Sequence, residues 1–319
     1  MRYQEIATCM AALHLGVVGA LQVNPVGAST QRSSIGSPVL RYSGAGLRGG
    51  AVQMQDAALV ATPPAGFEGA VAAGVKKAGM PASKIFGLGI LSGAHIGFGA
   101  FLMLSVGGAC PGLAATNPGL QKIVSGAFGL PFGLFMTLMT GAELFTGNTA
   151  LVTMATLEGK AEPDQLAKSW IASYAGNFVG SVALAALVFL GGTLVGGGAS
   201  VGASIAKTSL SFKAAFVRGI LCNWLVCMAV YMASFAKDTA GKMVAIWFPI
   251  SAFIALGLEH SVANMFIIPL GIFSGAAVTW KTFLLSNLLP VTLGNIVGGA
   301  VCVGAAFCAA YGTAFSKKE

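Results

Sequence analysis

Long apolar stretches follow one another along the chain from about residue 85 to residue 311. A helical membrane crossing needs about 20 apolar residues. By that measure the pattern predicts six spans, near 85–108, 123–155, 170–195, 214–236, 243–275 and 283–311. The chain is therefore predicted to be an all-α membrane protein with six transmembrane helices.

The second and fifth stretches are longer than one helix needs, and both carry polar groups in the middle. The second contains Glu143, Thr146, Gly147 and Asn148, and the fifth contains Glu259, His260 and Asn264. Irregular backbone inside a membrane is tolerated only where protein or a water-filled cavity satisfies its polar groups. We therefore expect helices 2 and 5 to be interrupted and to line a pathway.

Short motifs recur in the two halves of the chain in the same order. GIL occurs at 89–91 and 219–221, G-x-E-x4-N at 141–148 and 257–264, and GN-x-VG at 176–180 and 294–298. These matches indicate an internal duplication of three spans each. Because three is an odd number, the second copy enters from the opposite side, which predicts an inverted 3+3 repeat with a substrate path near the midplane.

Composition supports the membrane assignment and excludes other classes. Charged residues make up 9% of the 319 positions and hydrophobic residues 55%, whereas charged residues are about 25% of an average soluble protein. The net charge of +8 comes from scattered cations, without the basic patch that nucleic-acid binding requires. The six cysteines form no CxxC pair and have no metal spacing with histidine. We predict no nucleic-acid partner, no metal and no cofactor.

The first 55 residues have the composition of a targeting presequence. An apolar run at 6–23 precedes the small residues at 26–28, a site typical of signal-peptidase cleavage. The next stretch is rich in Arg and Ser and contains no acid before Asp56, as organellar transit peptides do. The two runs together predict a cleaved presequence for a plastid envelope. An ordinary secretory signal followed by a tail, with the plasma membrane as destination, is the alternative.

The expected domain organisation follows from these segments. Residues 1–55 are the presequence, 56–82 a surface amphipathic helix and linker, 83–315 the six-span transport domain, and 316–319 a tail.

Three segments resemble the signatures of the formate/nitrite transporter family: MTGAELFTGN at 139–148, GILCNWLVCMA at 219–229 and GLEHSVANMF at 257–266. The resemblance covers residues 63–315. It implies an aquaporin-like fold, a homopentamer with one pore per protomer in the lipid membrane, and small monovalent anions as substrates. With the presequence, the chain most resembles the nitrite transporters of algal plastids. Nitrite or formate is the expected anion, and bicarbonate is the alternative.

His260 is the predicted centre of the pathway, because it matches the family's central pore histidine. Histidine exchanges a proton near neutral pH. A bare anion in hydrocarbon carries a Born penalty of order tens of kcal/mol, which proton transfer from His260 to the anion would remove. Transport coupled to protons is therefore one expected mechanism. Glu259 and its repeat partner Glu143 are expected to accept hydrogen bonds from freed backbone N–H groups at the breaks.

The resemblance also implies roles for five further residues. Asn223 matches a pore-side asparagine and Lys207 a lysine of the outer vestibule, while Phe145, Phe253 and Leu151 match the residues that narrow the pore.

Two other classes of function remain open at this point. A membrane-embedded enzyme could use His260 and Glu259, but the chain has no HExxH, no GxSxG and no pair of catalytic carboxylates, so no catalytic residue is predicted. A neutral-solute channel of the water or ammonia type would keep its permeability after the loss of Lys207.

Overall fold

The computed structural model describes residues 60–194 and 198–315. The described chain folds into helices joined by short turns, and Val60 and Ala236 form an isolated bridge. The elements are α2 (Pro63–Ala78), α3 (Ala82–Val106), η1 (Gly107–Ala109), α4 (Pro111–Thr116), α5 (Pro118–Ala127), α6 (Leu130–Thr140), α7 (Phe145–Leu157), α8 (Pro163–Gly191), α9 (Gly198–Thr208), α10 (Phe212–Ala233), α11 (Thr239–Ala255), α12 (Ser261–Phe273), α13 (Trp280–Thr282), the π-helical turns η2 (Phe283–Leu288) and η3 (Ala300–Ala305), α14 (Leu289–Gly299) and α15 (Ala306–Tyr311). The predicted presequence 1–55 and tail 316–319 lie outside the described residues.

Five helical segments of the described chain are long and apolar enough to cross a membrane: Ala82–Ala109, Pro118–Thr140, Pro163–Gly191, Phe212–Ala233 and Trp280–Tyr311. The fifth predicted span instead consists of two shorter apolar helices, α11 and α12. Large apolar side chains such as Phe248, Ile171 and Leu256 are two-thirds or more exposed. This outer surface suits lipid rather than water.

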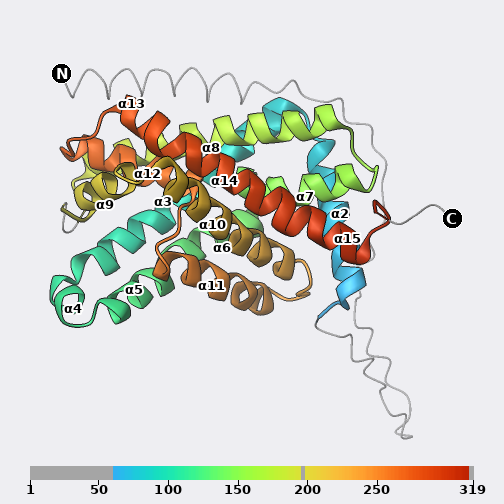
Figure 1. Ribbon diagram of the computed structural model, residues 1–319, viewed down its shortest axis with the longest axis horizontal. Coiled ribbons are helices and arrows are strands. Elements are labelled where there is room, and N and C mark those ends of the chain that lie inside the picture. The colour runs from blue at the N-terminus through green and yellow to red at the C-terminus, as the bar shows by residue number, and fades with distance from the viewer. Residues whose placement is uncertain (1–59, 195–197, 316–319) are drawn as a thin grey trace, which may run out of the picture.

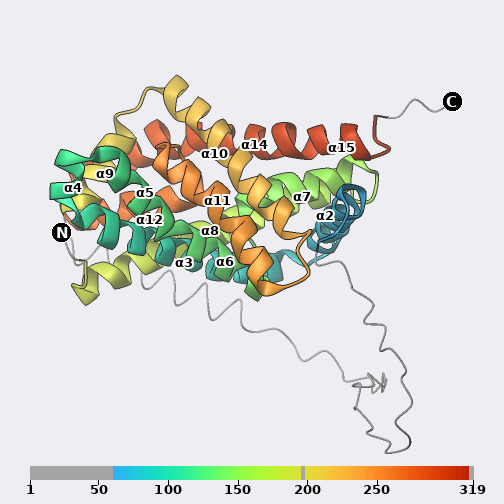
Figure 2. The same ribbon diagram turned by 90° about the horizontal axis from the view of Figure 1, so that it is seen from below.

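Each of the two predicted interruptions coincides with the end of a helix. α6 ends at Thr140 and α7 begins at Phe145, while α11 ends at Ala255 and α12 begins at Ser261. α7 lies in the half of the molecule that holds α2, and α12 lies in the opposite half with α9 (Figures 1 and 2). The two short helices therefore start near the middle and run outward in opposite directions.

Glycines allow the long helices to approach closely. α3 packs against α8, where a Cβ on Gly180 would lie 1.9 Å from the Ile90 carbonyl oxygen. α10 packs in the same way against α14, where a Cβ on Gly298 would lie 2.3 Å from the Ile220 carbonyl oxygen. Any larger residue would force these helices apart, which explains the repeated GN-x-VG motif as a packing device.

α2 lies against the described core. Pro63 and Pro64 begin the helix, and Phe67, Val71 and Gly74 are among the residues it buries. A Cβ on Gly74 would lie 2.0 Å from the Leu151 carbonyl oxygen of α7. The domain boundaries, including the surface position of 56–82 in a membrane, stay predictions.

Candidate functional site

Both breaks use the same local design. A glycine in the left-handed region ends each first helix: Gly141 with φ 73° after α6, and Gly257 with φ 70° after α11. Only glycine adopts this conformation without a steric cost. A short extended segment then leads to the next helix, whose N-terminal residues are Leu144 and His260 in β conformation. The free backbone groups at each break need partners, and the amides of Glu143 and Glu259 donate to the backbone carbonyls of Leu88 and Arg218.

A buried carboxylate sits in each break and is paired with a lysine from another helix. Lys77 Nζ lies 2.7 Å from Glu143 Oε1, and Lys207 Nζ lies 2.9 Å from Glu259 Oε1. Both glutamate side chains are 3% exposed, and the lysines are 18% and 19% exposed. A buried carboxylate is tolerated only with a partner charge and further hydrogen bonds.

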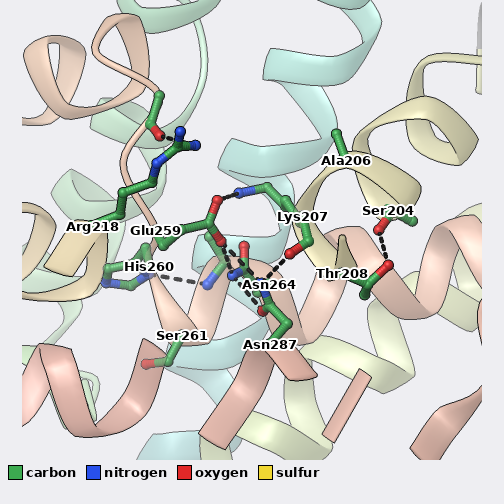
Figure 3. Close-up of polar contacts among 12 residues, drawn as sticks. Ser204, Ala206, Lys207, Thr208, Arg218, Glu259, His260, Ser261, Asn264 and Asn287 are labelled. Atoms are coloured by element: carbon green, nitrogen blue, oxygen red, sulfur yellow. Dashed lines mark hydrogen bonds and ion pairs between the residues drawn. The ribbon is translucent and has the colours of Figure 1, made fainter. Parts of the chain in front are cut away.

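Asparagines supply those further hydrogen bonds. Asn148 Nδ2 donates to Glu143 Oε2 at 2.8 Å, and Asn264 Nδ2 donates to Glu259 Oε2 at 2.7 Å. Asn287 adds a second donor to Glu259 Oε2 at 3.2 Å. Figure 3 shows this group, with Lys207 on one side of Glu259 and the two amides on the other. The expected donors are therefore corrected: the two carboxylates accept hydrogen bonds from lysine and asparagine side chains, and not from the freed backbone N–H groups of the breaks.

A second pair of asparagines ties each break to the neighbouring helices. Asn177 Oδ1 accepts from the Phe145 amide, and its Nδ2 donates to the carbonyls of Gly89 and Glu143 at 2.9 and 2.8 Å. Asn295 repeats the arrangement: Oδ1 accepts from the Ser261 amide, and Nδ2 donates to the carbonyls of Gly219 and Glu259 at 2.8 and 3.0 Å. Asn177 and Asn295 therefore make equivalent contacts in the two halves.

His260 breaks this equivalence, because the first half has Leu144 at the corresponding helix start. Its Nδ1 accepts the Ala263 backbone N–H at 3.0 Å, which caps α12, and its Nε2 lies 3.0 Å from Thr146 Oγ1. A nitrogen that accepts a hydrogen bond carries no proton, so the neutral ring holds its proton on Nε2. The ring is 3% exposed and its centroid lies 5.9 Å from that of Phe253. His260 thus has one N–H donor, on Nε2, and in this structure that donor faces the hydroxyl of Thr146.

Two cavities approach this point from opposite ends of the molecule. The Lys207 vestibule is a cavity of about 260 Å³ whose lining includes Lys207, Arg218, Phe253, Glu259 and His260. The Lys77 vestibule is a cavity of about 540 Å³ whose lining includes Lys76, Lys77, Lys84, Lys242, Glu143 and Leu151. The first lies toward α9 and the second toward α2, the two ends seen in Figure 1.

Between the vestibules is a space of only about 10 Å³. Leu134, Leu144, Val226, Phe253 and His260 are among its lining residues. That volume is about the size of a single water molecule. The geometry is therefore two basic vestibules separated by an apolar constriction with one donor, His260.

The predicted site residues fall into two groups. His260 and Phe253 line both the constriction and the Lys207 vestibule, and Lys207, Glu259 and Asn264 also line that vestibule. Glu143 and Leu151 line the Lys77 vestibule, so Leu151 is not among the residues of the constriction, where it was predicted. Phe145 is not among the residues that line these cavities; it packs edge-on against Tyr174 with ring centroids 4.8 Å apart, and Leu144 lines the constriction in its place. Thr146 contacts His260, whereas Gly147 faces Val230.

Asn223 lies behind the constriction and is fully buried. Its Nδ2 donates to Thr149 Oγ1 at 2.9 Å and to the carbonyls of Asn295 and Thr146 at 2.6 and 3.2 Å. These contacts tie α10 to α7 and α14. A direct pore role for Asn223 stays a prediction.

The sequence analysis missed Lys77 and Asn287. Lys77 stands at the end of a helix, where lysine is common, and its partner Glu143 is 66 residues away. A search for the repeat equivalent of Lys207 could have found it. Asn287 lies in the apolar stretch of the sixth predicted span without a motif around it.

Comparison with known proteins settles the family. The family model for formate/nitrite transporters matches residues 64–309. The chain belongs to the formate/nitrite transporter family. It is 42% identical over 251 residues to the probable formate transporter of Methanothermobacter thermautotrophicus, covering 72% of this chain and 90% of that protein. It is 34% identical over 263 residues to the formate channel FocA of Escherichia coli K12, covering 75% and 90%.

Solved structures of family members have the same fold. An FNT family ion channel aligns with a TM-score of 0.70 at 32% identity, covering 77% of this chain and 98% of that one. A pentameric formate channel with formate bound aligns with a TM-score of 0.62 at 30% identity, covering 72% and 97%. The chain is thus a helical integral membrane protein of a transport family and not an enzyme.

Proposed function

We propose that this formate/nitrite transporter family member passes small monovalent anions across a membrane, and that formate is its main substrate. The observation that carries the proposal is the pair of lysine-bearing vestibules on either side of a constriction with a single N–H donor. Lysine fields raise the local anion concentration at each mouth. The names of the relatives favour formate. Nitrite and bicarbonate carry the same charge and are also small and planar, so they are the alternatives.

The constriction favours passage of the neutral acid. Its lining is apolar apart from His260, and a bare anion there would pay a Born penalty of order tens of kcal/mol. Formate that takes up a proton from the water of the vestibule becomes formic acid, which needs only a hydrogen-bond partner. His260 Nε2–H supplies that partner when the acid replaces Thr146 Oγ1 as its acceptor. The proton then travels with the anion, and transport is proton-coupled.

The hydrogen bond by which His260 caps α12 limits how the ring can transfer a proton. Loss of the Nε2 proton from the neutral ring would leave an imidazolate anion, so the ring can act as an acid only after Nδ1 has taken up a proton. Nδ1 already accepts the Ala263 N–H. Proton relay through the ring therefore requires α12 to lose its cap. For this reason we propose that the neutral ring donates a hydrogen bond to the passing acid. Proton relay through the ring is the less favourable alternative, because it would break the cap of α12.

We further propose an aquaporin-like inverted 3+3 repeat of six spans. The first half contains α3, the interrupted span α5–α6–α7, and α8; the second contains α10, the interrupted span α11–α12, and α13–α15. The matching contacts of Asn177 with Asn295 and of Glu143 with Glu259 support this division. By similarity to the pentameric formate channel, we propose a homopentamer.

The plastid envelope remains our proposal for the location, and it rests on residues 1–55 of the sequence. A fluorescent fusion of the full chain, compared with one that starts at residue 56, tests it. Plastid targeting of the full chain alone supports the proposal, and plasma-membrane targeting contradicts it.

Reconstitution tests the transport function. Proteoliposomes should take up formate saturably and acidify their lumen, while nitrite and bicarbonate uptake ranks the alternatives. Water or ammonia permeability without anion uptake would instead support a neutral-solute channel.

A further inference from the structure

The two vestibules differ strongly in charge. The Lys77 vestibule is lined by four lysines, Lys76, Lys77, Lys84 and Lys242, and by one carboxylate, Glu143. The Lys207 vestibule has two cations, Lys207 and Arg218, and one carboxylate, Glu259. One monovalent anion at a time would be attracted by either arrangement. The larger excess of positive charge at one end therefore needs a separate explanation.

Three of the four lysines have no carboxylate partner. Lys77 is paired with Glu143, but Lys76, Lys84 and Lys242 form no ion pair within the described parts of the chain. They come from three helices, α2, α3 and α11. Glu143 lines the same cavity but is already paired with Lys77, so the mutual repulsion of the three remaining lysines favours an external anion between them.

One of these lysines also stands at an unfavourable position of its helix. Lys242 follows the first turn of α11, where the Asp238 carboxylate caps the helix and offsets its dipole, but Lys84 lies in the first turn of α3. The positive end of the helix dipole disfavours cations there and favours anions. α3 also begins without a side-chain cap, so its first N–H groups add to the positive potential.

The size of the cavity agrees with a bound ligand. At about 540 Å³ the Lys77 vestibule lies within the range of roughly 300–1,000 Å³ typical of small-molecule sites, and the Lys207 vestibule, at about 260 Å³, lies below it. The adjoining constriction of about 10 Å³ would stop anything larger than the transported anion.

We propose that the Lys77 vestibule binds multivalent phosphate-type oxyanions, and that a bound oxyanion blocks anion passage from that end. The attraction between the lysines and a ligand grows with ligand charge, so a multivalent anion outcompetes formate there. The binding part is independent of the proposed function, whereas the block rests on it.

Calorimetric titration of the purified full chain in uncharged detergent tests the binding. At constant ionic strength, pyrophosphate should bind saturably and more tightly than formate. A charge at about 6 Å in a water-like dielectric changes the affinity about tenfold for a divalent ligand and about threefold for a monovalent one. Lys84→Gln and Lys242→Gln should each weaken pyrophosphate binding about tenfold or more, and Lys281→Gln, at the opposite end, should leave it unchanged. Unsaturable binding, or equal effects of all three variants, overturns the proposal.

Formate uptake measured with pyrophosphate on one or on both sides of the vesicle membrane tests whether only one vestibule binds it. Vesicles with both protein orientations should lose part of their formate uptake with pyrophosphate outside and the remainder when it is also loaded inside. Complete block from outside alone would show that both vestibules bind it and would overturn the assignment. If vesicles without pyrophosphate take up no formate, the proposed function fails, while the calorimetric result still decides the binding.

Lipid phosphate is a second source of the same chemistry. The block is therefore measured in zwitterionic and in anionic vesicles at one ionic strength. An equal block in both assigns the site to soluble oxyanions. Loss of the block in anionic lipid alone assigns it to headgroups and overturns the soluble-anion proposal.

Discussion

The ion pair between Lys207 and Glu259 is expected to hold the second break together. Removing one partner of a buried pair costs about 3–5 kcal/mol, because the other charge stays buried without compensation. Glu259 is 3% exposed, but Lys207 is 19% exposed, and Asn264 and Asn287 still donate to the carboxylate. We therefore expect Lys207→Met to destabilise the protein by about 3 kcal/mol, the low end of that range.

Thermal and denaturant unfolding in detergent measure this cost. The double variant Lys207→Met/Glu259→Gln should lose less stability than Lys207→Met alone, since the glutamine leaves no buried charge. Lys281→Met, which is not in a described ion pair, is the matched control and should behave as the native protein. If the double variant is at least as unstable as the single one, the buried charge is not the cause and the reasoning is wrong.

Three further predictions concern the scaffold. Asn295→Ala leaves the Ser261 amide and two carbonyls without their partner and should cost about 2–3 kcal/mol in unfolding experiments, whereas a near-neutral result would show that water replaces the amide. Gly180→Ala should cost about 1–3 kcal/mol or more by separating α3 from α8, while Gly69→Ala, with open space around it, should cost nothing; equal stabilities would contradict the close packing. Burial raises the pKa of Glu158, but hydrogen bonds from Thr313 and Ala314 outweigh it and lower that pKa below 4.5. The contact is therefore present above about pH 4.5 and lost as the pH falls through the lowered pKa, so hydrogen exchange at residues 313–315, corrected for intrinsic rates, should accelerate on acidification. Glu158→Gln should remove this pH dependence, and an unchanged profile in the variant would contradict it.

The sequence was informative where polar residues interrupt an apolar stretch. Glu143 and Glu259 stand out because a charge inside a span is costly, and the glycine two residues before each marks the end of the helix. Asn177 and Asn295 could be paired by their motifs, which place them beside the close helix contacts. These features are local, so a single sequence shows them.

The sequence alone did not predict ion-pair partners that are far apart in the chain, or which of two neighbouring residues faces the constriction. Lys77 reaches Glu143 across 66 positions, and no local pattern connects the two. Phe145 was predicted at the constriction, but Leu144 lines it, because the extended Leu144 faces the cavity while the first helical residue turns toward α8. Which neighbour faces the pore depends on the position of the helix start, which is uncertain by a residue or two from sequence.

Formate flux through variants of His260 shows whether the constriction needs the N–H donor of this residue. We expect saturable, proton-coupled uptake into proteoliposomes by the native chain. His260→Asn keeps a side-chain N–H donor and should retain part of the flux, and His260→Phe should lose it, with both variants checked for folding by thermal unfolding. Folded His260→Phe protein that carries formate at the native rate would contradict the account, because the constriction would then need no donor.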